Sequence, residues 1–195
     1  MKMAKAWLWL ILCLALIGSH HNVLGEEAMS VNRFREIVAQ AGDHVPLIAP
    51  LVSIPIWTNA IISNVMTSAS GKVYRETLPE SVHTIGGKYV VYTTWSKNFP
   101  QPFNSVLAYD ANVDALRVYT LLKDGHGEDR LTAGTVDYDF ANKTYTINLT
   151  YGDGFQKTTH GTYTLSESVS RSEITQNGVH LLSIDIVTRA VVPDK

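Results

Sequence analysis

The fold is decided by the stretch 144–151, which reads Thr-Tyr-Thr-Ile-Asn-Leu-Thr-Tyr. Aromatic or aliphatic residues alternate in it with small polar ones. Successive side chains of a β-strand point to opposite faces of a sheet, so this pattern predicts a strand with one buried and one solvated face. Such half-buried strands are typical of antiparallel sheets.

Period-two patterns of this kind extend from residue 71 to the end of the chain. The nine candidate strands span 72–78, 84–96, 104–109, 115–123, 131–138, 144–151, 155–165, 168–175 and 179–191. Short turns join them. Asn177-Gly178 is a typical two-residue hairpin turn, and Gly152-Asp153-Gly154 suits the hairpin before it. Consecutive strands joined by short turns predict an up-and-down antiparallel meander.

The N-terminus indicates export. Lys2 and Lys5 precede an unbroken apolar run from Ala6 to Ile17, and the small Gly25 would stand just before a cleavage site. This pattern predicts a signal peptide over residues 1–25 and a secreted, extracellular protein. The single cysteine, Cys13, would be lost with it, so the mature chain would have no disulfide.

A secreted domain without disulfides needs a continuous core and few exposed strand edges. Closure of the meander would provide both. We therefore expect a mainly β fold: an antiparallel barrel of about 8–9 strands with an N-terminal helix. A sandwich of two sheets is the alternative.

Residues 28–41 are predicted to form that helix. Val31, Phe34 and Val38 fall on one helical face, Ser30 suits the N-cap, and Gly42 would end the helix. We expect the apolar face to pack on the domain. Docking of a partner or a lipid surface is the alternative.

The stretch 45–71 contains no charged side chain and is rich in large apolar residues. Pro46, Pro50 and Pro55 argue against a membrane-spanning helix, because proline removes a backbone donor and clashes with the preceding turn. We expect an irregular segment or strand that plugs or lines the core; an exposed binding surface is the alternative. The predicted organisation is a signal peptide (1–25), a helix with an apolar segment packed on the barrel (26–70) and the barrel domain (71–195).

The composition and motifs exclude several functions. Loss of Lys2 and Lys5 would change the formal net charge from −2 to −4, and no basic cluster supports nucleic-acid binding. Asp124-Gly125-His126-Gly127-Glu128-Asp129 gathers possible metal ligands but lacks calcium-loop or zinc spacing. No nucleophile elbow or phosphate-binding loop occurs. We therefore expect no bound metal, no cofactor and no enzymatic activity. A catalytic site assembled from residues distant in the sequence is the alternative.

Two N-glycosylation sequons are present, at Asn142-Lys143-Thr144 and Asn148-Leu149-Thr150. Asn142 falls in a predicted turn, and Asn148 lies on the polar face of its strand. Both side chains should therefore face water, which suits a secreted glycoprotein.

The chain resembles the calycins, the superfamily of lipocalins and fatty-acid-binding proteins. Gly87-Lys88-Tyr89 is similar to the lipocalin Gly-x-Trp motif, and Val136-Asp137-Tyr138 to the Thr-Asp-Tyr of a later lipocalin strand. The resemblance covers residues 71–195 at the level of fold. It implies a lipocalin-like carrier and assigns no binding residue.

The leading functional hypothesis is a secreted barrel that binds a small apolar ligand in its interior. The candidate lining residues are Tyr89, Val91, Trp95, Leu116, Val118, Tyr145, Ile147 and Leu149. The second hypothesis is an interaction protein that docks a partner or lipid surface through residues 28–66. The third is a barrel enzyme with no recognisable motif.

Overall fold

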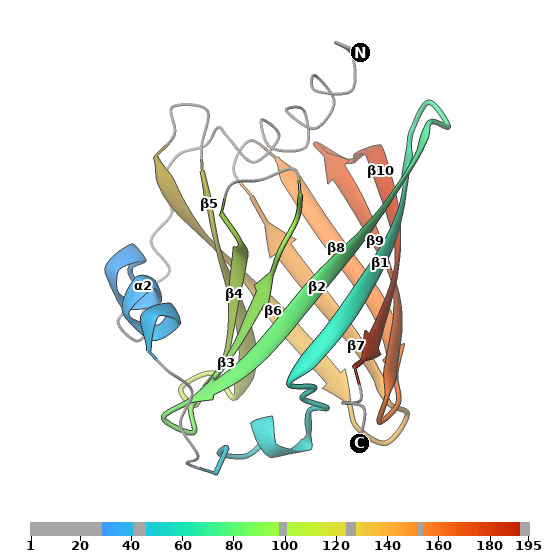
Figure 1. Cartoon of the computed structure of the whole chain (residues 1–195). Coiled ribbons are helices and arrows are strands. Elements are labelled where there is room, and N and C mark those ends of the chain that lie inside the picture. The colour runs from blue at the N-terminus through green and yellow to red at the C-terminus, as the bar shows by residue number, and fades with distance from the viewer. Residues whose placement is uncertain (1–28, 41–45, 98–100, 124–127, 152–153, 192–195) are drawn as a thin grey trace.

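Ten antiparallel strands form a closed barrel in the computed structural model, which describes residues 29–40, 46–97, 101–123, 128–151 and 154–191 (Figure 1). Each strand pairs with its neighbours in the chain, and the first pairs with the last. The strands are β1 (Asn59–Ser68), β2 (Val73–Ile85), β3 (Tyr89–Thr94), β4 (Phe103–Asp110), β5 (Ala115–Lys123), β6 (Asp129–Asp139), β7 (Thr144–Thr150), β8 (Phe155–Tyr163), β9 (Glu167–Gln176) and β10 (Val179–Ala190).

The predicted closure of a β-meander is confirmed, but the barrel has ten strands rather than eight or nine. The additional strand is β1, which lies in the apolar segment that we expected to pack on the barrel and to plug or line its core. β1 pairs with β2 on one side and with β10 on the other, so the barrel begins at Asn59 and not at residue 71. Its apolar residues come in adjacent pairs, Ile61-Ile62 and Val65-Met66, which hides the period of two.

The first hairpin of the predicted meander also differs. We expected strands at 72–78 and 84–96, with Pro79 in the connection. β2 instead continues through Pro79 to Ile85, and the turn falls at Gly86 and Gly87, whose φ angles are 56° and 65°. Glycine adopts this left-handed conformation at little cost, so the two glycines set the turn.

Residues 46–58 close one end of the barrel, seen at the lower end in Figure 1. The segment is irregular apart from a short 3-10 helix, Leu51–Ser53. Leu51 and Ile54 are buried in one cluster with the inward-facing Val82, Leu107 and Val136. The charge-free segment therefore divides into a plug that fills part of the barrel and the strand β1.

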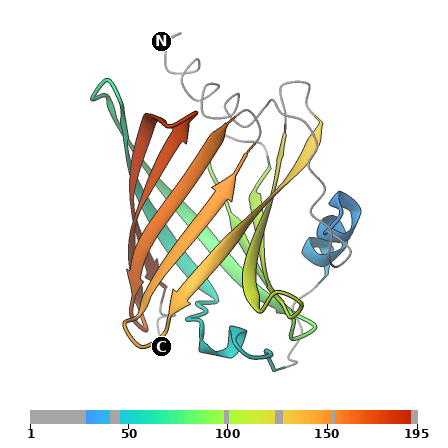
Figure 2. The same ribbon diagram turned by 180° about the vertical axis from the view of Figure 1, so that it is seen from behind.

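The helix α2 (Val31–Ala39) lies against the outside of the barrel wall (Figures 1 and 2). The backbone N–H of Arg33 donates to Ser30 Oγ at 3.1 Å, so Ser30 is the predicted N-cap. Phe34 and Ile37 are fully buried in a cluster with outward-facing residues of β2, β3 and β4. The apolar face of the helix thus covers the barrel wall.

Within the part of the chain that the structure describes, no helix combines the length and apolar character needed to cross a bilayer. The predicted signal peptide, Gly42 and the last four residues lie outside the described residues.

Candidate ligand-binding cavity

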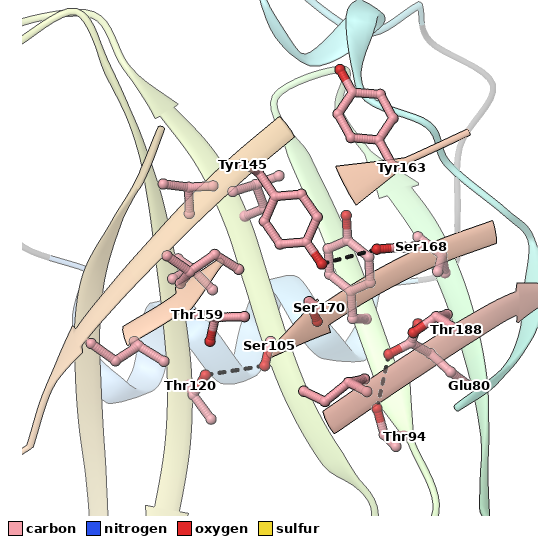
Figure 3. Close-up of a pocket in the computed structure, with 18 of the residues that line it drawn as sticks. Glu80, Thr94, Ser105, Thr120, Tyr145, Thr159, Tyr163, Ser168, Ser170 and Thr188 are labelled. Carbon is pink, nitrogen blue, oxygen red and sulfur yellow. Dashed lines mark hydrogen bonds between the residues drawn. The ribbon is translucent and has the colours of Figure 1, made fainter. Parts of the chain in front are cut away.

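A cavity of about 420 Å³ occupies the barrel interior. Figure 3 shows side chains from different strands pointing into it. Its apolar and aromatic lining comprises Pro55, Trp57, Val82, Tyr92, Phe103, Leu107, Val118, Val136, Tyr138, Tyr145, Ile147, Leu149, Tyr151, Tyr163 and Ile186. Its hydroxyl-bearing and charged lining comprises Glu80, Thr94, Ser105, Thr120, Lys157, Thr159, Ser168, Ser170 and Thr188. The cavity is therefore mainly apolar, with polar groups at several points of its wall.

Strand alternation explains much of the predicted lining. In β7, Tyr145, Ile147 and Leu149 all face the cavity, as the alternation in residues 144–151 predicts. Val118 of β5 also lines it. Leu116 of β5 was also predicted to line the cavity, but it is buried in the cluster that contains Leu51 and Ile54 and does not line the cavity.

Three further predicted lining residues lie outside the barrel interior. Tyr89 and Val91 of β3 pack against α2 on the outer face of the barrel. Trp95 follows β3, is 42% exposed and does not line the cavity. Both faces of β3 are largely apolar because the helix covers the outer one, so the pattern did not reveal which face is inside. The inward residues are Val90, Tyr92 and Thr94, each paired across the sheet with an inward residue of β4.

Hydroxyl groups pair with one another along the wall (Figure 3). Tyr145 Oη lies 2.9 Å from Ser168 Oγ, and Ser105 Oγ lies 3.0 Å from Thr120 Oγ1. Thr159 Oγ1 and Ser172 Oγ are 2.8 Å apart. Side-chain hydroxyls inside the barrel thus satisfy one another across neighbouring strands, which limits the cost of burying them.

Gly161 positions the Tyr145 ring. The two residues face each other across β7 and β8. A Cβ atom on Gly161 would lie 2.4 Å from Tyr145 Cζ and 2.7 Å from Ser170 Cβ. The ring therefore lies over the glycine, and a larger residue there would displace it.

The tyrosines form a group at the side of the cavity. The centroid of the Tyr138 ring lies 5.6 Å from the ring centroid of Tyr145 and 5.8 Å from that of Tyr163. Burial raises the pKa of Tyr151 to about 12, and burial is also the largest cause of the raised pKa of Tyr138. The phenols of Tyr138 and Tyr151 are therefore neutral hydrogen-bonding groups at physiological pH.

Glu80 of β2 is the one acidic residue among the lining residues. Burial raises its pKa from 4.5 to about 7, although a hydrogen bond from Thr94 Oγ1 to Glu80 Oε2, 3.0 Å long, opposes the shift. Sequence analysis missed this residue. Its position between Leu78 and Val82, in a period of two, was the available signal.

Lys157 of β8 is the basic residue of the lining, and sequence analysis missed it as well. It faces Leu149 of β7 and Ile174 of β9 in the sheet register. Burial lowers its pKa, because the charged ammonium is poorly solvated there. The cavity thus holds an acid and a base that are both disfavoured in their charged forms.

A cluster on β9 and β10 resembles a catalytic triad in composition but not in geometry. His180 Nε2 lies 2.7 Å from Glu173 Oε2 and 2.9 Å from Ser183 Oγ. A Ser-His-acid triad uses both ring nitrogens, one toward the nucleophile and one toward the acid. Here both contacts are made by the same nitrogen, so this arrangement does not support nucleophilic catalysis.

Among the residues that the structure describes, no three His, Cys, Asp or Glu side chains gather in a group suited to a metal ion. Of the predicted stretch 124–129 with possible metal ligands, residues 124–127 lie outside the described residues.

The two sequons lie on the outer surface. Asn142 is exposed in the β6–β7 turn, where its Nδ2 donates to Asp139 Oδ2 at 2.6 Å. Asn148 is exposed on the outward face of β7 and accepts a hydrogen bond from Thr158 at 3.1 Å. Their positions follow the sequence analysis, and their glycosylation stays a prediction.

Comparison of the chain with family models, with curated proteins and with solved structures finds no match. The closed barrel is consistent with a calycin-like fold, and its cavity is the strongest guide to function.

Proposed function

We propose that this protein is a secreted barrel that binds one small organic molecule in its interior. The cavity carries the proposal. Its volume of about 420 Å³ falls within the range of roughly 300–1,000 Å³ that is typical of small-molecule sites.

The lining favours a ligand with a mostly apolar or aromatic body and a few polar groups. Trp57, Tyr92 and Tyr138 offer ring surfaces, while Ser170 and Thr188 offer hydroxyls. The driving force would be the transfer of the apolar body from water into a preformed pocket. The hydroxyls would then fix the orientation of the ligand.

The apolar residues of the N-terminal region support this reading over partner docking. Phe34 and Ile37 are buried against the barrel wall, and Leu51 and Ile54 are buried inside the barrel. Their apolar surface therefore stabilises the barrel itself. Secretion and glycosylation are part of the proposal on the strength of the N-terminal pattern and the two surface sequons.

Titration with the neutral fluorescent probe N-phenyl-1-naphthylamine tests the proposal. We expect saturable binding with a stoichiometry of one. Val118→Phe places a ring in the cavity and should weaken binding at least about tenfold, since a filled pocket cannot admit the probe. Val169→Phe is the matched control, because Val169 is 46% exposed on the outer face of β9 and its replacement should leave the affinity unchanged.

Absence of saturable binding to the wild type would overturn the proposal. Equal affinity of the two variants and the wild type would also overturn it, since the probe would then bind outside the barrel. Circular dichroism would establish that Val118→Phe is folded. Native mass spectrometry of the wild type with the probe gives the stoichiometry independently of any variant.

A further inference from the structure

We propose that the ligand carries a protonated amine on an aromatic or otherwise apolar body, and that the amine pairs with the Glu80 carboxylate. This inference rests on the proposed function, since it names the chemical class of the molecule in the same cavity.

The carboxylate of Glu80 has spare capacity to accept hydrogen bonds. Its Oε2 accepts from Thr94 Oγ1 at 3.0 Å. Within the part of the chain that the structure describes, this is the one hydrogen bond of the Glu80 side chain. An ionised carboxylate offers about four acceptor positions. An ammonium group provides three donors, so it would satisfy positions that the protein leaves open.

The wall beside Glu80 leaves room for such a group. Across the sheet, Glu80 faces Ala60 of β1, and Ala60 faces Ala190 of β10. On this side, β1 and β10 therefore present only methyl groups at this level, whereas β3 on the other side presents Thr94. Thr94 and Thr188 lie on either side of the carboxylate, and all three side chains point into the cavity (Figure 3). The two hydroxyls could accept from the same ammonium group.

Aromatic side chains occupy the same cavity. Trp57, Tyr92 and Phe103 all line it. Burial is the largest cause of the raised pKa of Tyr92, and the nearby Glu80 carboxylate adds to it. The faces of aromatic rings attract cations, and this attraction is stronger where water is excluded. Rings together with a carboxylate favour an amine over a neutral or anionic group.

Lys157, the other charged lining residue, does not neutralise this preference. It lies on β8, which is separated from β2 by β9, β10 and β1 on the shorter way around the barrel. Desolvation is the cause of its lowered pKa, and the same burial favours the neutral amine form. Glu80 therefore remains available to a ligand.

Three probes of similar shape and different charge test the inference: 2-phenylethylamine, 2-phenylethanol and 3-phenylpropanoate. Their affinities are measured at pH 7.5 by displacement of N-phenyl-1-naphthylamine and by calorimetry. We expect the amine to bind at least about tenfold more tightly than the alcohol, as a charge-assisted hydrogen bond would allow, and the carboxylate to bind most weakly.

Glu80→Gln should abolish the preference for the amine while leaving the affinity for the alcohol unchanged. Glu76→Gln is the matched control. Glu76 lies on the same strand and faces the same interior, but its Oε1 accepts from Ser96 Oγ at 2.5 Å and the residue does not line the cavity. Its replacement should therefore preserve the preference.

Each other outcome contradicts the inference. If the alcohol binds as tightly as the amine, or if Glu80→Gln keeps the preference, the ligand class is wrong while the proposed function stands. If 3-phenylpropanoate binds most tightly and Lys157→Met abolishes this, the cavity selects an acid. If none of the probes binds and the naphthylamine probe does not bind either, the proposed function falls as well.

Discussion

Replacement of Glu80 by Gln should change how the stability of the barrel depends on pH. The pKa of this carboxyl rises from 4.5 to about 7 because burial penalises its charged form. Between these values the folded protein retains a proton that the unfolded chain has lost. The contribution of Glu80 to the free energy of unfolding therefore falls as pH rises from 4.5 to above 7.

The size of the effect follows from the shift. Each pKa unit corresponds to about 1.4 kcal/mol, so the shift to about 7 corresponds to roughly 3 kcal/mol lost between pH 4.5 and pH 8. Glutamine has nearly the same shape and stays neutral throughout. The variant should thus match the wild type at pH 4.5 and exceed its stability by up to about 3 kcal/mol at pH 8.

Urea unfolding at pH 4.5, 6, 7 and 8, followed by circular dichroism, gives the two stability curves. Their difference isolates Glu80, since the other titrating groups are common to both proteins. Glu36→Gln serves as a control, because the Glu36 side chain is 63% exposed on α2 and its loss should leave the wild-type curve unchanged. A difference between the wild type and Glu80→Gln that is constant across this range would refute a buried, destabilised carboxylate.

Three further substitutions probe other parts of the barrel. Lys157→Met should raise the free energy of unfolding at pH 7 by about 1–3 kcal/mol, since it removes an amine whose charged form is penalised by burial. Because the pKa of Lys157 is lowered, this gain over the wild type should shrink as pH rises toward 10.5, and an unchanged urea midpoint at pH 7 would contradict the prediction. Gly134→Ala should lower the free energy of unfolding by about 1–3 kcal/mol, because the new Cβ would lie 2.2 Å from the Asn148 backbone oxygen. A urea midpoint equal to that of the wild type would show that β6 and β7 can move apart at no cost in free energy. Leu51→Ala should cost about 2–5 kcal/mol in thermal or urea unfolding, whereas Val52→Ala, at a neighbouring position that is 66% exposed, should cost little; equal effects would mean that the plug is not part of the core.

The course of the chain through most of the barrel was predictable from local sequence. The strand β7 follows from its alternation, and the β9–β10 turn follows from Asn177 and Gly178, which both adopt a positive φ. Ser30 predicted the start of α2 through the oxygen that it offers to a backbone N–H. These features depend on residues that are close in the sequence, so periodicity and turn chemistry reveal them.

Sequence reasoning failed where a face of the sheet is covered by a distant element. Tyr89 and Val91 of β3 are apolar because α2 packs on them. β1 was missed for another reason, because its adjacent apolar pairs, Ile61-Ile62 and Val65-Met66, place apolar residues on both faces. In both strands the alternation no longer distinguishes the inside from the outside. Glu80 and Lys157 were missed because single charged residues in a strand are normally assigned to the solvated face.

The sequence alone determined that this protein is an antiparallel meander, because most strands and most turns are specified by their own residues. Only the tertiary structure decided how the meander closes. Pairing of β1 with β10 joins residues at the two ends of the domain, and the plug enters the same barrel. That closure turns one face of every strand inward at once, and so creates a cavity in which Glu80 lies among aromatic rings. No local pattern encodes such a site, because its residues are brought together only by contacts between strands that are distant in the sequence.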